Sequence, residues 1–222
     1  ILDVNVERGE KIAAELGDDV IFCKTDVISE DSVQAAMDKT MDAFGAIHVA
    51  VNCAGSGDAI KVLSKKGPYP LDRFNFIIQL NLIGTFNVIR LAAGKMVLNT
   101  PNEDGEKGVI INTSSDAAFE GQIGQAAYSA SKAGVVGMTL PIAREFADYG
   151  LRMVTIAPGL FMTPLVDTLP EKVVEALAGS VPFPKRLGKA SEFAMLTRQI
   201  VENPMLNGNT IRIDGAIRMT AR

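Results

Sequence analysis

Short runs of β-branched residues alternate with helical patterns along nearly the whole chain. The runs are VIFCK (20–24), IHVAVN (47–52), VIINTS (109–114), RMVTIAP (152–158) and TIRID (210–214), and segments of helical spacing occupy 6–16, 30–44, 71–98, 127–147 and 189–202. Strands this apolar need helices on both faces of their sheet. The pattern therefore predicts an α/β fold with a doubly wound parallel sheet.

Composition limits the classes of protein to which this chain can belong. With 222 residues, 47% of them hydrophobic, it can bury the core of a single domain over 1–222. A net charge of −4 and an isoelectric point near 5.1 provide no basic surface for nucleic acid. No apolar run approaches the length of a bilayer span. We expect one domain without a nucleic-acid partner or a membrane span.

The chain has one histidine and two cysteines, which is too few for a histidine metal cluster or a zinc site. His48 lies in a strand-like run, where a packed or hydrogen-bonded side chain is expected. Cys23 and Cys53 lie in apolar surroundings, which favours reduced core thiols and an intracellular compartment. The sequence predicts no metal and no serine–histidine triad.

Small and hydroxyl-bearing residues follow three of the predicted strands, in VNCAG (51–55), INTSS (111–115) and APG (157–159). Each has an ordinary explanation by itself: a strand-to-loop glycine, a polar strand end and a turn. In a doubly wound sheet, however, the ligand lies outside the carboxyl ends of the strands. The shared position of these motifs predicts a site at that edge.

A tyrosine and a lysine stand four positions apart in QAAYSASKAG (125–134), so Tyr128 and Lys132 share one helix face. One interpretation is structural: Tyr128 fills a gap and Lys132 extends to water. The other is proton transfer, because a nearby cation and a hydroxyl donor move the pKa of a phenol toward neutrality. Ser115, thirteen residues before Tyr128, would polarise a carbonyl oxygen. A nicotinamide would carry the hydride.

These motifs together resemble the short-chain dehydrogenase/reductase family, whose Y-x-x-x-K follows a catalytic serine by about a dozen residues. Ser115, rather than Ser114, matches that serine. The resemblance implies that Tyr128 is the acid–base residue, that Ser115 orients the substrate oxygen, and that Lys132 binds the ribose and lowers the tyrosine pKa. Asn81, in LNLIGTFNV, matches the asparagine that relays protons through water.

The resemblance also implies a nucleotide site. The residues that it assigns there are Asp26 and Val27 (TDV) at the adenine, Asn52, Ala54 and Gly55 (NCAG) under the cofactor, Pro158 and Gly159 beside the nicotinamide, and Thr163 at the carboxamide. Asp3 ends the apolar start ILD, as an acidic residue ends the second strand of a dinucleotide fold. There it binds ribose hydroxyls and repels a 2′-phosphate, so NAD is favoured over NADP; an exposed loop aspartate is the alternative.

Within the family, longer stretches such as IAPGLFMTPL, VPFPKRLG and NGNTIRIDGAIRM resemble the type 2 3-hydroxyacyl-CoA dehydrogenases, also called type 10 17β-hydroxysteroid dehydrogenases. This implies NAD-linked oxidation of 3-hydroxyacyl-CoA thioesters, tolerance of hydroxysteroids, a homotetramer and a mitochondrial location. Ala130, Gly134 and Gly137 form a small-residue helix face suited to packing between subunits.

The Gly- and Pro-rich segment 159–190 is expected to be a mobile substrate segment. Its apolar residues could line an acyl or steroid pocket or pack on the core, and the basic pair at 185–186 could meet a CoA phosphate or remain solvated. The apolar residues are Leu160, Phe161, Leu165 and Leu169.

Two features depart from the family pattern. No glycine-rich phosphate loop precedes Asp3, so we expect the natural polypeptide to begin earlier, and this chain alone to have a split sheet and weak NAD binding. The same feature supports an alternative, a noncatalytic binding or assembly subunit. The second departure is Asp116, directly after Ser115, which strand alternation is expected to direct outward.

Overall fold

The computed structural model describes residues 1–163, 166 and 170–221. The strands are β1 (Leu2–Asp3), β2 (Cys23–Lys24), β3 (Val49–Asn52), β4 (Leu63–Ser64), β5 (Gly67–Pro68), β6 (Gly108–Thr113), β7 (Leu151–Pro158) and β8 (Thr210–Ile213). The α-helices are α1 (Val6–Leu16), α2 (Glu30–Phe44), α3 (Leu71–Ile78), α4 (Gly84–Met96), α5 (Ala126–Ala147), α6 (Glu171–Ser180) and α7 (Ala190–Glu202). A π-helical turn, η1 (Gln79–Ile83), joins α3 to α4, and a 3₁₀ turn, η2 (Asp116–Ala118), follows β6.

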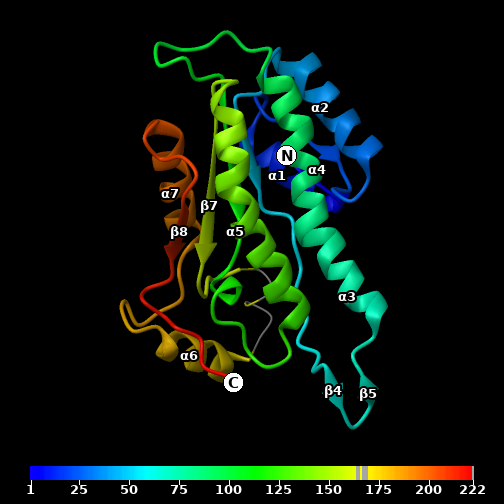
Figure 1. Ribbon diagram of the computed structural model, residues 1–222, viewed down its shortest axis with the longest axis vertical. Helices are drawn as coiled ribbons and strands as arrows, with labels where there is room; N and C mark the ends of the chain where they lie inside the picture. Colours follow the sequence, from blue (N-terminus) through cyan, green and yellow to red (C-terminus); the bar gives the residue numbers. More distant parts are fainter. Residues whose placement is uncertain (164–165, 167–169, 222) are drawn as a thin grey trace.

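Four strands form a parallel sheet in the order β3-β6-β7-β8 (Figure 1). Its centre is the pair β6–β7, in which Gly108 lies opposite Leu151 and Thr113 opposite Ile156. Both strands are buried over almost their full length. The β-branched runs fit this position, because a pleated surface buried on both faces accommodates branched side chains on either side. This confirms the predicted parallel α/β architecture.

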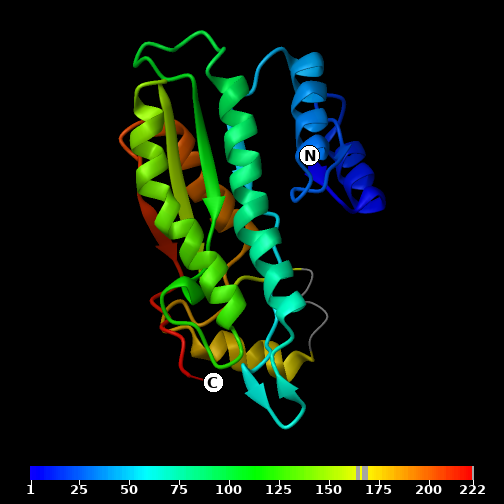
Figure 2. The same cartoon turned by 45° about the vertical axis from the view of Figure 1, so that its right-hand side comes forward.

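Successive residues of β6 enter different cores, as the two-residue period of a strand requires. Ile110 packs with Met153 and residues of α2, α4 and α5, whereas Val109 and Ile111 pack with Val154, Ile156 and Ile200 of α7. Helices α4 and α5 therefore cover one face of the sheet and α7 the other (Figures 1 and 2). The sheet is therefore covered on both faces, and because its strands are parallel their carboxyl ends lie at one edge.

Strands β1 and β2 pair with each other, in parallel, and form a sheet separate from the four-stranded one. Figure 2 shows this N-terminal part, in blue, set apart from the large sheet. A cavity of about 640 Å³ lies between them, lined from one side by Leu2 and from the other by Val49 and Val51. The two valines are 40% and 41% exposed. The division of the sheet agrees with the expectation from sequence.

Residues Leu71–Met96 form one helical run of 26 residues that is long and apolar enough to cross a membrane, by length and composition only. Half of its most apolar window is buried inside the protein. The run matches the helical segment expected at 71–98, but the expectation that no apolar run approaches the length of a bilayer span is wrong by length and composition. Its π-helical turn carries Asn81, which is fully buried; such turns are frequent at functional sites.

Side-chain caps explain why two helix boundaries match the sequence expectation. Asn5 accepts a hydrogen bond from the Arg8 N–H at the start of α1, and Ser29 accepts one from the Ser32 N–H at the start of α2. Helix α2 ends at Gly45, whose φ of 75° lies in the left-handed region.

The hairpin β4–β5 and helix α6 were not expected, because both lie among Gly and Pro residues.

Two expectations about single residues are wrong. His48 is exposed rather than packed, although its backbone oxygen accepts the Val109 N–H. Both cysteines are free, as expected, but only Cys23 is a core thiol, whereas Cys53 is exposed. Cys53 lines the cavity at the end of β3, where the four-stranded sheet has no further strand.

Candidate active site

The predicted catalytic residues meet beyond the carboxyl ends of β6 and β7, where helix α5 begins (Figure 1). Ser115 is 7% exposed and caps η2, with its hydroxyl oxygen accepting the Ala117 N–H at 3.2 Å. Its neighbour Ser114 is buried and donates to the backbone oxygen of Lys132 at 2.8 Å. Ser114 therefore ties the strand to the helix, and Ser115 is the serine that reaches the tyrosine.

Tyr128 is partly buried in the first turn of α5. Burial raises the pKa of the Tyr128 phenol, and the charge of Asp116 also raises it. The Ser115 hydroxyl, which hydrogen-bonds the phenol, lowers this pKa. We expected neighbouring groups to lower the pKa of Tyr128, and this expectation is wrong because the pKa is raised overall. The physical reason is desolvation, which disfavours the phenolate more than one hydroxyl donor favours it.

Lys132 is 5% exposed, so the interpretation in which it extends to water is wrong. Its ammonium group donates to the Thr113 backbone oxygen at 2.8 Å and lies 5.8 Å from the centre of the Tyr128 ring. Burial lowers the pKa of Lys132 to about 8. The strand end and the helix thus hold a desolvated cation beside the phenol.

Asn81 connects the helical run to the loop after β3. Its side chain accepts the Ser56 N–H at 2.9 Å and donates to the Ser56 oxygen at 2.8 Å and to the Ser131 hydroxyl at 3.0 Å. Because both ends of the amide are bonded, Asn81 fixes the position of that loop relative to α5.

Gly55 lies so close to this network that a larger residue does not fit. A Cβ atom at position 55 would stand 3.0 Å from the Asn81 Oδ1 and 3.4 Å from the Lys132 Nζ. We expect Gly55→Val to displace Asn81 and Lys132 and to reduce kcat/KM by more than about tenfold. Gly94→Ala is the matched control, since a Cβ there meets nothing within 4 Å. Equal rates for the Gly55→Val protein and the wild type would contradict this geometry.

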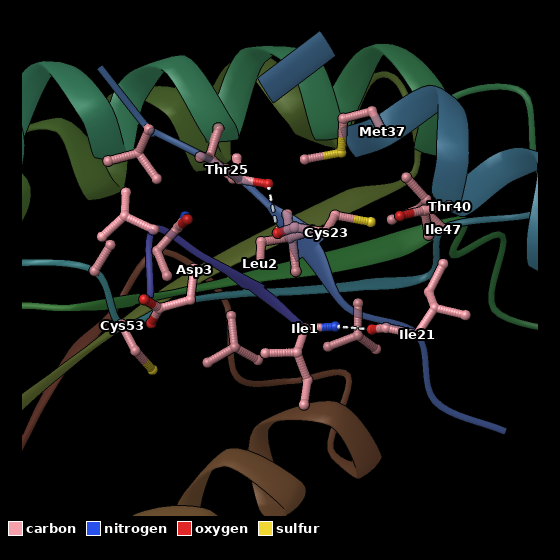
Figure 3. A pocket seen from close by; sticks show the side chains of 18 of the residues that line it. Ile1, Leu2, Asp3, Ile21, Cys23, Thr25, Met37, Thr40, Ile47 and Cys53 are labelled. Atoms are coloured by element: carbon pink, nitrogen blue, oxygen red, sulfur yellow. Dashed lines mark hydrogen bonds between the residues drawn. The ribbon is translucent and has the colours of Figure 1, made fainter. Parts of the chain in front are cut away.

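Residues predicted to bind the nucleotide surround the cavity between β1 and β3. They are Asp3, Asp26, Val27, Asn52, Ala54 and Gly55. Figure 3 shows Asp3 and Cys53 on the same side of this cavity. Asp3 accepts the Asn5 N–H at 2.8 Å through Oδ1, which holds its carboxylate at the end of β1. An acidic strand end and small residues at 54 and 55 fit the adenosine half of a dinucleotide.

The remaining predicted cofactor residues lie at the end of β7. Pro158 ends the strand, and the Gly159 N–H donates to the Ile213 oxygen at 3.0 Å. A Cβ at position 159 would stand 2.9 Å from Asp116 Oδ2 and from Asp214 Cβ, so only glycine fits. Thr163 is exposed. The structure brings Pro158 and Gly159 to the Ser115 edge of the site.

Asp116 is fully buried, so the expectation of an outward-facing side chain is wrong. Strand alternation does not apply to it, because β6 ends at Thr113 and Asp116 begins the turn η2. Its Oδ1 lies 3.2 Å from Arg212, which also pairs with Glu120 and Asp214. Sequence reasoning missed this cluster, since nothing in the spacing of residues 116, 120, 212 and 214 indicates contact.

Two of the four apolar residues predicted to bind the substrate lie among the described residues. Leu160 and Phe161 border a small cavity of about 140 Å³, and Phe161 packs edge-on against Phe193 of α7, which supports the core-packing alternative for Phe161. Leu165 and Leu169 lie outside the described residues. In the basic pair, Lys185 is exposed, whereas Arg186 bonds Glu192 at 2.6 and 2.8 Å.

Comparison with known proteins identifies this combination of fold and site. A family model described as short chain dehydrogenase matches residues 1–173. The chain belongs to this family. It is 58% identical to the mouse 3-hydroxyacyl-CoA dehydrogenase type-2 and 56% identical to the Drosophila melanogaster protein of that name, covering 99% of this chain and 85% and 87% of those proteins. The crystal structure of 3-hydroxyacyl-CoA dehydrogenase type-2 from Mycobacterium avium superposes with a TM-score of 0.94 at 41% identity, covering all of this chain and 86% of that one.

Membership in the short-chain dehydrogenase family makes the chain an oxidoreductase that uses a nicotinamide dinucleotide. The expected family is thus confirmed, and the noncatalytic alternative loses its support. In the part of the chain that the structure describes, no group of three or more His, Cys, Asp or Glu residues is placed to hold a metal ion.

Proposed function

We propose that the protein interconverts 3-hydroxyacyl-CoA thioesters and their 3-oxo forms with NAD as the hydride carrier. The observation that carries this proposal is the contact of Ser115, Tyr128 and buried Lys132 at the strand ends, in a chain 58% identical to a 3-hydroxyacyl-CoA dehydrogenase. When bound, the nicotinamide supplies or accepts the hydride.

The proposal assigns a role to each of the four residues. Tyr128 donates a proton to the carbonyl oxygen in reduction and accepts it from the alcohol in oxidation. Ser115 orients that oxygen by hydrogen bonding, and Lys132 binds the ribose while its charge favours the tyrosinate. Asn81 holds the loop at Ser56 through its amide, and we assign the relay of protons through water to it.

The preference for NAD rests on Asp3. Its carboxylate lies at the end of β1 beside the cavity, where it would bond ribose hydroxyls and repel a 2′-phosphate. We expect Asp3→Ala to lower the NAD-to-NADP ratio of kcat/KM by roughly 10- to 100-fold, because the repulsion disappears. Initial rates with both cofactors measure this. Asp19→Ala, which removes another carboxylate that lines the same cavity, is the control and should leave the ratio unchanged. An unchanged ratio in Asp3→Ala would contradict the assignment.

The location, the assembly and the wider substrate range are further parts of the proposal. The mitochondrial location and the activity on hydroxysteroids are proposed from the family resemblance of the sequence motifs. Exposed apolar side chains along the long helical run and α5 support a homotetramer. They include Phe76, Ile83, Phe86 and Leu140. Segment 159–190 would cover the acyl chain, with Leu160 nearest the strand end.

Oxidation of 3-hydroxybutyryl-CoA by NAD tests the substrate class, with free 3-hydroxybutyrate as the matched control. The full-length natural polypeptide is expected to reduce NAD with the thioester far faster than with the free acid, because binding of the CoA part contributes to catalysis. Comparable rates with both substrates would contradict the proposed specificity for CoA thioesters.

A further inference from the structure

Arg212 is the centre of an ion-pair cluster that the proposed mechanism does not use. It lies in β8, at the edge of the large sheet, opposite Ala157 of β7 (Figure 1). This register brings it to the carboxyl ends of the strands, close to the end of β7 at Pro158. Its side chain is 21% exposed, so the guanidinium group lies mostly inside the protein. A guanidinium group in such a place needs acceptors for its donors, and these acceptors show which segments it holds together.

The guanidinium group binds the segment that follows Ser115. Its two terminal nitrogens donate to the two carboxylate oxygens of Glu120 at 2.8 and 2.9 Å, and its central carbon lies 5.2 Å from the centre of the Phe119 ring. Its Nη2 also lies 3.2 Å from Asp116 Oδ1. Arg212 therefore contacts the turn η2 and the residues directly after it through three side chains. A bidentate bond to a carboxylate fixes the direction of both partners, and a lysine cannot reproduce it.

Asp116 depends on Arg212 more than the other acids of the cluster do. Its side chain is fully buried, and in the described part of the chain neither of its oxygens accepts a hydrogen bond. Among those same residues, Arg212 is its one ion-pair partner. Glu120 and Asp214, in contrast, also pair with Arg218. Without Arg212 the buried carboxylate would lose the cation that it contacts, and η2 would have to move to bring Asp116 to water.

The turn η2 fixes the side chain of Ser115. The Ala117 N–H donates to the Ser115 hydroxyl oxygen at 3.2 Å, and the Ala118 N–H donates to the Ser115 backbone oxygen at 3.0 Å. Both bonds require that Asp116–Ala118 keep their 3₁₀ conformation. A movement of Asp116 would therefore displace the hydroxyl that is assigned to the substrate oxygen.

The same cluster joins η2 to the end of β7. Both Asp116 and Asp214 contact Gly159, because a Cβ at position 159 would stand 2.9 Å from Asp116 Oδ2 and from Asp214 Cβ. The Nε of Arg212 donates to Asp214 at 2.7 Å. One side chain thus connects the serine edge of the site to the strand end that is assigned to the nicotinamide.

We propose that Arg212 is a positioning residue that holds η2, and through it the Ser115 hydroxyl, in place beside the end of β7. It acts through Asp116 and Glu120 rather than on the substrate. The inference rests on the role proposed for Ser115 in the reaction. A displaced hydroxyl would orient the substrate oxygen poorly, whereas the nucleotide cavity, which other residues line, would keep its shape.

Steady-state kinetics of Arg212→Ala in the full-length natural polypeptide separate positioning from folding, with rates expressed per NADH-binding site. We expect kcat with acetoacetyl-CoA to fall by about ten- to a hundredfold and the KM for NADH to change by less than about twofold. Millimolar guanidinium chloride should restore part of the rate, because the ion can bind Glu120 as the side chain did; sodium chloride at the same ionic strength should not. Arg212→Lys keeps the charge without the fork and should lose less, and it carries the same comparisons if the alanine variant does not fold.

Two further variants identify the residue through which Arg212 acts. In a Ser115→Ala background, Arg212→Ala should lower kcat no further, because the hydroxyl that it positions is absent. Arg218→Ala is the matched control, since it removes a cation 3.6 Å from Glu120 and 3.0 Å from Asp214 but leaves Asp116 paired. It should keep kcat within about twofold of the wild type. An equal loss with and without the serine, or an equal loss in Arg218→Ala, would overturn the inference.

Amide hydrogen exchange without substrate keeps this test apart from the test of the proposed function. Peptides that span residues 114–120 report the Ala117 and Ala118 N–H groups, and Arg212→Ala should raise their exchange rates by about tenfold or more. Peptides from α2 should not change. Unchanged exchange in 114–120 would overturn the inference, even with a loss of kcat. Faster exchange there, in a protein that does not turn over CoA thioesters, would leave this inference standing and count against the proposed function alone.

Discussion

Replacing Tyr128 by phenylalanine is expected to reduce kcat for both directions of the reaction by about a thousandfold. The ring remains in place beside Lys132, so packing is kept, but the hydroxyl that exchanges the proton with the substrate oxygen is removed. Binding of the nucleotide should change little. Steady-state rates and a nucleotide titration on the same preparation separate the two effects.

Tyr149→Phe is the matched control, because that tyrosine is 59% exposed at the end of α5. It should retain the wild-type rate. A Tyr128→Phe protein that also retained it would show that the phenol takes no part in proton transfer, and the proposed site would then be wrong.

Loss of the Arg152 side chain is the largest stability effect that the structure predicts. Its guanidinium group pairs with Glu106 at 2.8 Å and donates to four backbone oxygens at the end of α7 and in the following loop, those of Ile200, Val201, Asn203 and Leu206. The side chain is only 7% exposed. Arg152→Ala leaves a carboxylate and several helix-end carbonyls without a donor. We expect a loss of about 3–5 kcal/mol in the free energy of unfolding.

Urea denaturation followed by circular dichroism measures this loss. Arg198→Ala is the control, since Arg198 pairs with Glu202 across one exposed helical turn, with its side chain 77% exposed. That pair should contribute less than about 0.5 kcal/mol. Similar losses in the two variants would mean that Arg152 does not hold α7 to the sheet.

The sequence was sufficient for the elements whose signals are local. Helix α2 has a serine cap and a terminal glycine at its expected ends, and β6 and β7 are β-branched runs that few other structures accommodate. The contact of Ser115 with Tyr128 was also predictable, because parallel strands bring their carboxyl ends to one edge and the family motif selects the residues there.

What the sequence could not provide depends on burial and on contacts between distant segments. The turn η2 directs Asp116 inward, and only the folded chain places Arg212 beside it, 96 residues further along. The direction of the Tyr128 pKa shift depends on how much water reaches the phenol, which no spacing encodes. Helix α6 lies in a Gly- and Pro-rich segment, where Pro170 precedes its first turn and can start a helix as readily as it ends one.

Transfer of deuterium from the cofactor to the substrate tests the central claim most directly. The full-length natural polypeptide is mixed with acetoacetyl-CoA and with NADH deuterated at C4 of the nicotinamide, and the product is analysed by mass spectrometry. The account predicts 3-hydroxybutyryl-CoA that carries deuterium at C3, formed by the wild type and not by Tyr128→Phe. A folded protein that binds NADH but forms no labelled 3-hydroxybutyryl-CoA would contradict it.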